Sequence, residues 1–201
     1  MIGTAKALDR RAGGPVVFVV GIAGSGKSTV ARQLAAGLRG VYLDKDTVAE
    51  PFTGLILESA GHDRGDRESD FYRNVVMPLE YETLLSLGED NMRLGHPVIF
   101  DAPFGAYFSD KEYIRRRACE KSWPTGRRIV LRVQVDKECN RRQLSQRTSP
   151  RDAWKLEHWD EFWASAQRDC LWEDVEHITL NNTADSDVTR LITAIALSRT
   201  T

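Results

Sequence analysis

Short apolar runs alternate with stretches of helical periodicity along the whole chain. Five of these runs have the length and composition of strands, and the first of them, which is entirely apolar, is expected to be buried. They lie at residues 15–20, 41–44, 96–101, 128–135 and 177–181. Between them, apolar residues recur at helical spacing, most clearly at 28–39 and 187–198. Strands that alternate with helices predict βαβ crossovers, and therefore an α/β fold with a five-stranded, mainly parallel sheet between two helical layers.

Three further helices are expected from the same spacing, at residues 47–59, 68–94 and 154–168. Pro78 falls inside the second of them and is expected to kink or divide it. Ser109 and Asp136 are expected to act as N-caps of the helices that follow them. With 201 residues and no convincing linker, the chain is expected to form one domain, 1–201.

The first strand leads directly into Gly-Ile-Ala-Gly-Ser-Gly-Lys-Ser-Thr, residues 21–29, which fits the phosphate-binding P-loop pattern G-x-x-x-x-G-K-[ST] without a mismatch. A strand before the loop and a helix after it are the context that the motif requires. The pattern predicts that Lys27 reaches the β- and γ-phosphates of a nucleoside triphosphate and that the hydroxyl of Ser28 holds Mg²⁺. The predicted phosphate-binding residues are Gly21, Ala23, Gly24, Ser25, Gly26, Lys27, Ser28 and Thr29.

Carboxylates follow the second and third strands, where the parallel sheet would bring them near the P-loop. We favour Asp46 as the group that accepts the proton of an attacking hydroxyl or orients that hydroxyl. Asp44 is the alternative, or a neighbour of the magnesium ion, and either residue could instead cap the next helix. Asp101 ends an apolar strand in the manner of a Walker B aspartate and is predicted to bind Mg²⁺. Because Ala-Pro follows Asp101 rather than a glutamate, transfer to a bound acceptor is favoured over hydrolysis.

An arginine cluster lies on either side of Pro150, after the fourth strand. Two helices joined by a short break and rich in guanidinium groups would suit a lid, at about 137–156, which neutralises the transferring phosphoryl group and excludes water. Arg147 is the favoured residue of this lid, followed by Arg142 and Arg151. A solvated helix face is the alternative interpretation.

The composition disfavours several classes of partner and site. The formal net charge of −1 provides no general basic field, so nucleic acid is a disfavoured partner, although a local basic groove is still compatible with that average. The three cysteines form no CxxC pair, which suggests a reduced, cytoplasmic setting, and no apolar run is long enough to cross a membrane. The four histidines are too scattered to indicate a metal site. The residues at 181–183 would either contact an adenine edge or form a turn.

The P-loop, Asp46, Asp101 and the arginine lid, in this order, resemble the small P-loop kinases related to zeta toxin, chloramphenicol phosphotransferase, gluconate kinase and the kinase domain of polynucleotide kinase. Residues 149–159, Ser-Pro-Arg-Asp-Ala-Trp-Lys-Leu-Glu-His-Trp, resemble the lid region of AAA_33-type proteins. The resemblance implies a three-layer P-loop fold, use of ATP, activation of a hydroxyl by Asp46 and phosphate contacts from the lid arginines. Several relatives carry an arginine soon after the aspartate of the second strand, whereas Thr-Val-Ala follows Asp46 here, so the acceptor stays open.

The sequence therefore predicts a kinase that uses ATP and Mg²⁺ to phosphorylate a hydroxyl group of a small molecule. Two alternatives remain at this point. One is a polynucleotide 5′-hydroxyl kinase, and the other is a nucleotide-binding switch module with little transfer activity.

Overall fold

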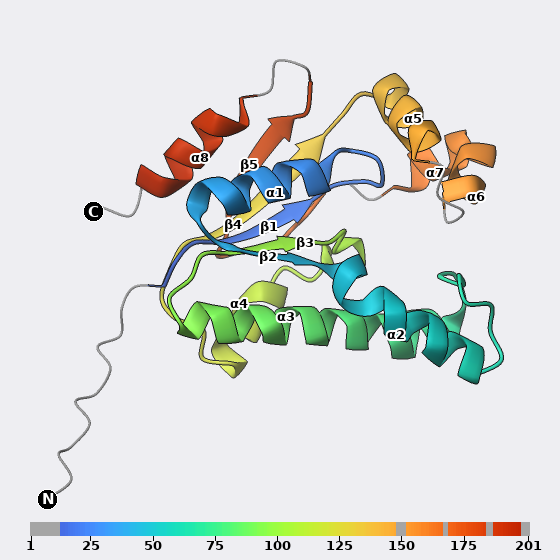
Figure 1. Cartoon of the computed structure of the whole chain (residues 1–201), viewed down its shortest axis with the longest axis horizontal. Helices are drawn as coiled ribbons and strands as arrows, with labels where there is room; N and C mark the ends of the chain where they lie inside the picture. The colour runs from blue at the N-terminus through green and yellow to red at the C-terminus, as the bar shows by residue number, and fades with distance from the viewer. Residues whose placement is uncertain (1–12, 148–151, 167–168, 184–186, 198–201) are drawn as a thin grey trace, which may run out of the picture.

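The computed structural model describes residues 13–147, 152–166, 169–183 and 187–197 (Figure 1). The strands are β1 (Val16–Val20), β2 (Val41–Asp44), β3 (Val98–Asp101), β4 (Arg128–Gln134) and β5 (Glu176–Asn181). The first five helices are α1 (Lys27–Leu38), α2 (Lys45–Ser59), α3 (Met77–Arg93), α4 (Tyr113–Glu120) and α5 (Lys137–Gln146). They are followed by α6 (Ala153–Glu157), α7 (Trp159–Ser165) and α8 (Val188–Leu197). A π-helical turn (Tyr72–Val76) precedes α3, and a short 3₁₀ turn (Gly105–Tyr107) follows β3.

The five strands form one sheet in the order β2-β3-β1-β4-β5, and all of its pairs are parallel. The predicted sheet is thus confirmed, since parallel neighbours need the crossover helices that the sequence pattern indicated. In the register of β2 and β3, Asp44 lies opposite Asp101, and Asp101 also pairs with Val19 on the other side. The last residues of β2 and β3, both aspartates, therefore lie side by side at the carboxyl ends of the strands, where β1 leads into the P-loop.

Alternate residues of the strands build two separate cores. Val17 and Val19 of β1 pack under α1 and α8 with residues such as Leu34 and Ile195. The intervening Phe18 and Val20 pack on the opposite face with residues of α3 and α4. Helices thus cover both faces of the sheet, while α5, α6 and α7 lie together beyond the carboxyl ends of the strands (Figure 1). Within the described residues, no helix combines the length and the apolar character needed to cross a membrane.

Several element boundaries differ from the sequence-based prediction. The stretch 68–94 is helical from residue 70 to Arg93, but its Tyr72–Val76 part is a π-helical turn that runs directly into α3, in which Pro78 is the second residue. The stretch 154–168 is divided at His158 into α6 and α7. The prediction that Ser109 is an N-cap is wrong, because α4 begins after Glu112 with no side-chain cap. Asp136 is confirmed as an N-cap, since its carboxylate accepts from the N–H of Cys139 at 2.8 Å.

Candidate active site

The P-loop lies between β1 and α1, and its glycines permit a close approach of two other segments. Gly26 has a positive φ of 85°, and a Cβ atom there would lie 2.2 Å from the amide nitrogen of Asn182, just after β5. Gly24 also has a positive φ, of 77°, and a Cβ there would lie 2.7 Å from Leu144 of α5. Only glycine combines this backbone conformation with so little space. The two glycines are thus needed for the contacts of the loop as well as for its turn.

Two asparagine side chains hold the P-loop from outside. The amide of Asn140, on α5, donates to the carbonyl of Ala23 at 2.8 Å. The amide of Asn182 donates to the carbonyl of Ser25 at 2.8 Å. These hydrogen bonds anchor two carbonyls of the loop to α5 and to the residue after β5. Sequence reasoning missed Asn140, and it placed Asn182 at an adenine edge or in a turn rather than on the P-loop backbone.

Lys27 is buried at the start of α1, with 8% of its surface exposed, and its Nζ donates to the carbonyl of Ile22 at 3.1 Å. Burial, together with the positive charges of Arg147 and Lys155, lowers the pKa of Lys27 from 10.5 to about 8. The negative charges of Asp101 and Asp46 act in the opposite direction. The side chain that the motif assigns to the phosphates is thus within electrostatic range of both predicted carboxylates.

The predicted lid residues do not all lie near Lys27. Arg147, at the end of α5, acts on the pKa of Lys27, and so does Lys155 of α6, which the sequence analysis had not singled out. Arg142 instead donates to Sγ of Cys139 on its own helix and is exposed. Asn140 and Leu144 face the P-loop, so the residue midway between them points away from it. The structure therefore does not bring Arg142 to the site, in contrast to the prediction. Arg151 lies outside the described residues.

The two aspartates that follow β2 have different surroundings. Both carboxylate oxygens of Asp44 are engaged in capping α2, since they accept from the N–H of Asp46 at 3.2 Å and from the hydroxyl of Thr47 at 2.7 Å. Asp46 is partly exposed, and one of its oxygens lies 3.5 Å from Nζ of Lys45. Of the alternatives considered for Asp44, the structure shows the helix cap. Both aspartates are partly exposed, and what distinguishes them is the cap that engages Asp44.

A buried polar cluster below Asp46 was not foreseen from the sequence. Nζ of Lys45 donates to Glu80 of α3 at 2.8 Å, and both side chains are almost entirely buried. The same carboxylate accepts from the hydroxyls of Thr53 at 2.5 Å and Tyr72 at 3.0 Å. Three donors on one carboxylate satisfy the buried charge, so the cluster fixes the start of α2, and with it Asp46, against α3.

The donor set fits a nucleotide with Mg²⁺ better than a metal ion held by the protein alone. Asp101 is buried at the end of β3, and its Oδ2 accepts from the hydroxyl of Tyr42 at 2.8 Å. Among the described residues, no group of three or more histidines, cysteines and acidic residues could hold a metal. Magnesium commonly uses one or two carboxylates together with substrate phosphates. The hydroxyl of Ser28 and Asp101 fit this role, whereas Asp44 is engaged in its cap.

The P-loop also contains a buried polar atom that is consistent with an anion site. Oγ of Ser25 has no hydrogen-bond partner among the described residues, although Ser25 is fully buried. Buried polar atoms without partners are rare in native proteins, and a bound phosphate would supply an acceptor there. The loop therefore fits a phosphate on three counts: its glycine conformations, Lys27 and this hydroxyl.

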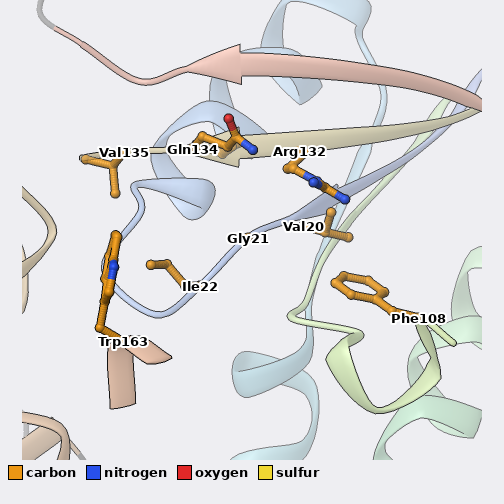
Figure 2. Close-up of a pocket in the computed structure, with 9 residues that line it drawn as sticks. Val20, Gly21, Ile22, Phe108, Arg132, Gln134, Val135 and Trp163 are labelled. Carbon is orange, nitrogen blue, oxygen red and sulfur yellow. The ribbon is translucent and has the colours of Figure 1, made fainter. Parts of the chain in front are cut away.

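A cavity of about 270 Å³ lies beside the first residues of the P-loop (Figure 2). Val20 and Ile22 form one wall, Phe108 and Trp163 contribute aromatic rings, and Arg132 and Gln134 enter from β4. In Figure 2 the ring of Trp163 faces Ile22 and Val135, while the guanidinium of Arg132 extends toward Val20 and Phe108. Sequence reasoning assigned Trp163 to packing and did not identify the cavity.

Comparisons with known proteins place this geometry in context. The chain is similar in fold to a protein from Chloroflexus aurantiacus whose name as a kinase is provisional, with 16% identity, coverage of 93% and 98% of the two chains, and a TM-score of 0.67. It is also similar to a sugar kinase from a Janibacter species, with 19% identity, coverage of 92% and 93%, and a TM-score of 0.58. A third similar structure is the APS kinase of Mycobacterium tuberculosis in complex with AMPPNP and APS, with 16% identity, coverage of 92% and 96%, and a TM-score of 0.52.

At these identities the likeness establishes the fold, which is the three-layer P-loop fold that the sequence predicted. No curated protein matches the chain at a significant level. The model of the AAA_33 family, described as an AAA domain, matches residues 16–168, which include the P-loop, all three predicted carboxylates and the whole of the predicted lid. With more than half of its length matched, the chain belongs to the AAA_33 family.

Proposed function

We propose that the protein is an ATP-dependent kinase that transfers the γ-phosphate to a hydroxyl group of a small-molecule acceptor. The observation that carries this proposal is the electrostatic surroundings of Lys27. Asp46 after β2, Asp101 at the end of β3 and Arg147 at the end of α5 all act on its pKa. A phosphate-binding lysine, two carboxylates and a lid cation in one place are the parts that phosphoryl transfer requires.

The P-loop residues 21–29 would bind the phosphates through their backbone N–H groups and Lys27. Ser28 and Asp101 would hold Mg²⁺, which when bound neutralises charge on the β- and γ-phosphates. Tyr42 supports this arrangement, because its hydrogen bond to Oδ2 orients the carboxylate of Asp101 at 2.8 Å.

Asp46 would orient the acceptor hydroxyl and accept its proton as the oxygen bonds to the γ-phosphorus. The bond between that phosphorus and the β–γ bridging oxygen breaks, and ADP leaves. Asp46 is favoured over Asp44 because the cap of α2 engages both oxygens of Asp44.

Arg147 and Lys155 would neutralise the charge of the transferring group from the lid side. A helical lid also excludes water, which would otherwise compete with the acceptor for the phosphoryl group. A small-molecule acceptor is favoured over nucleic acid, because the net charge of −1 gives no broad basic surface for a polynucleotide backbone.

The test is phosphoryl transfer from ATP to a pooled set of hydroxylated metabolites, nucleosides, aminoglycosides and short oligonucleotides, with products identified by mass spectrometry. Wild type should yield a product that gains one phosphate, and Asp46→Asn should slow its formation by about 10²- to 10⁴-fold while ATP still binds. Lys27→Ala should abolish transfer. Asp90→Asn, on the exposed side of α3, is the matched control and should leave the rate unchanged.

Two outcomes would contradict the proposal. Slow ATP hydrolysis that no acceptor accelerates and that Asp46→Asn does not alter would indicate a nucleotide-dependent switch. Transfer confined to oligonucleotides, with an affinity that falls steeply as salt rises, would indicate a polynucleotide kinase.

A further inference from the structure

The cavity beside the P-loop combines apolar walls with one charged group. Arg132 lies on β4 and faces the same side of the sheet as Val20, whereas its neighbour Val133 packs under α1. The walls next to Arg132 come from Val20 and from the ring of Phe108 (Figure 2). A guanidinium group against such walls favours a ligand that is apolar in its body and anionic at one end.

The ionic partner of Arg132 is one that a ligand could replace. Only 19% of the Arg132 side chain is exposed, and Nη1 donates to the carboxylate of Asp169 at 3.0 Å. The side chain of Asp169, however, is 85% exposed. Ion pairs with a solvated partner contribute little, so a buried guanidinium of this kind retains most of its capacity to bind an anion.

The cavity also borders the place where the γ-phosphate would lie. Ile22 lines the cavity, and its carbonyl accepts from Nζ of Lys27 at 3.1 Å. A compound in the cavity would therefore be separated from the phosphate-binding lysine by one backbone group. The nucleotide itself would lie along the P-loop and the start of α1, on the other side of Ile22.

We propose that this cavity binds the phosphate acceptor, and that Arg132 selects acceptors with an anionic group, a carboxylate or a phosphate, on a small apolar body. This inference rests on the proposed kinase function. The volume of about 270 Å³ is slightly below the range of about 300–1,000 Å³ typical of drug-sized ligands, which fits a compound of about one ring. Because Asp46 does not line the cavity, the anionic group and the reactive hydroxyl belong at opposite ends of the acceptor.

The test compares matched sets of single-ring hydroxy compounds. Each set contains a carboxylic acid, its primary carboxamide and the corresponding phosphate monoester, with the hydroxyl at the far end of the molecule. Binding is measured by calorimetric titration without ATP, and transfer is measured with ATP. Wild type should bind and phosphorylate anionic members of at least one set at least ten times better than the carboxamide. The acid and the phosphate ester together identify which anion is preferred.

Three variants test the role of Arg132. Arg132→Met should weaken binding of the anionic compound by about 10- to 100-fold, as expected for the loss of a charged hydrogen bond, and should remove the preference over the carboxamide. Arg132→Lys should retain part of the preference, because it keeps the charge. Asp169→Asn, on an exposed side chain, should keep or tighten binding, since it removes the competing carboxylate. Arg128→Met, at the other end of β4, is the matched control and should bind like wild type.

The outcomes separate this inference from the proposed function. If wild type phosphorylates neutral and anionic acceptors equally, and Arg132→Met does so too, the kinase proposal stands and the selectivity assigned to Arg132 is wrong. If anionic compounds bind in a manner that depends on Arg132 but receive no phosphate, while the pooled assay yields another phosphorylated product, the cavity is a ligand site other than the acceptor site and the kinase proposal stands. If no member of any set binds, the assignment of the cavity is overturned.

Discussion

The side-chain amide of Asn140 donates a hydrogen bond to the backbone carbonyl of Ala23, with 2.8 Å between nitrogen and oxygen. Asn140 belongs to the first helix of the predicted lid, and Ala23 belongs to the P-loop. Asn140 is fully buried, and among the described residues its Oδ1 has no hydrogen-bond partner. This hydrogen bond therefore couples the position of α5 to the conformation of the P-loop, together with the packing of Leu144 against Gly24.

We predict that Asn140→Ala weakens ATP binding by about 5- to 100-fold, because the carbonyl of Ala23 loses its buried donor at a cost of about 1–3 kcal/mol. Fluorescent-nucleotide titration measures this change. Ser145→Ala, which removes an exposed hydroxyl from the same helix, is the control and should bind ATP normally. Unchanged affinity in Asn140→Ala would show that the P-loop keeps its conformation without α5.

Nucleotide binding should take up a proton above pH 8. Lys27 has a pKa of about 8 in the free protein because it is buried, and nearby phosphates would favour its charged form. At pH 8.5 most free molecules would carry neutral Lys27, so ATP binding should absorb most of one proton, and affinity should fall as the pH rises further. Calorimetry in two buffers of different ionisation enthalpy measures the uptake. Lys27→Met should abolish it, and an equal enthalpy in both buffers for wild type would contradict the prediction.

The same pKa has a consequence for stability. Folded Lys27 loses its proton near pH 8, whereas an unfolded lysine retains it to about pH 10.5. Between these values the unfolded state binds more protons, so the contribution of Lys27 makes the free energy of unfolding rise with pH. Comparison of urea unfolding of wild type and Lys27→Met at pH 7.5 and pH 10 should show this difference in slope.

The buried pair of Lys45 and Glu80 should be costly to break. Lys45→Met leaves the carboxylate of Glu80 buried without its cation and should lower the free energy of unfolding by about 3–5 kcal/mol. Adding Glu80→Gln should recover part of the loss, because the uncompensated charge is then removed. Lys111→Met, which breaks an exposed pair with Glu173, should cost less than about 1 kcal/mol. Equal losses for the buried and the exposed pair would contradict the assigned role.

Substitutions of Asp44 and Asp46 should have different effects on stability and on the transfer rate measured in a Mg²⁺ titration. Asp44→Ala removes the N-cap of α2 and should lower stability by about 1 kcal/mol, with a normal Mg²⁺ requirement for transfer. Asp46→Asn should lower the transfer rate and leave stability nearly unchanged. A strongly raised Mg²⁺ requirement in Asp44→Ala would instead restore Asp44 as a magnesium ligand.

Features encoded in local sequence were predicted well. The P-loop is a contiguous pattern, and the strands lie in short stretches rich in β-branched and other apolar residues, so both could be located without knowledge of the fold. The N-cap at Asp136 is likewise local, because its carboxylate reaches a backbone N–H only three residues ahead. Ser109 failed as a cap for the complementary reason: the chain makes a further turn before α4, and residue type alone does not report where a helix starts.

Features that depend on distant contacts could not be predicted. Lys45 and Glu80 are 35 residues apart, and Asn140 and Ala23 are 117 residues apart, so nothing local indicates that they meet. Arg142 was chosen for its residue type, whereas its position on α5 directs it away from the P-loop. The spacing of Asn140 and Leu144 marks the face of the helix that packs inward, and Arg147, which the sequence analysis already favoured over Arg142, continues that spacing.

The contact between Asn182 and the P-loop also affects the choice of boundaries for a recombinant fragment. The match to the family ends at residue 168, whereas β5 and Asn182 come after it. A recombinant fragment trimmed to residues 16–168 would lose the fifth strand and the donor to the carbonyl of Ser25. Such a fragment would retain every residue of the P-loop motif and still lack one of the two side chains that hold the loop. Expression of the whole chain is therefore the sound basis for every measurement of nucleotide binding.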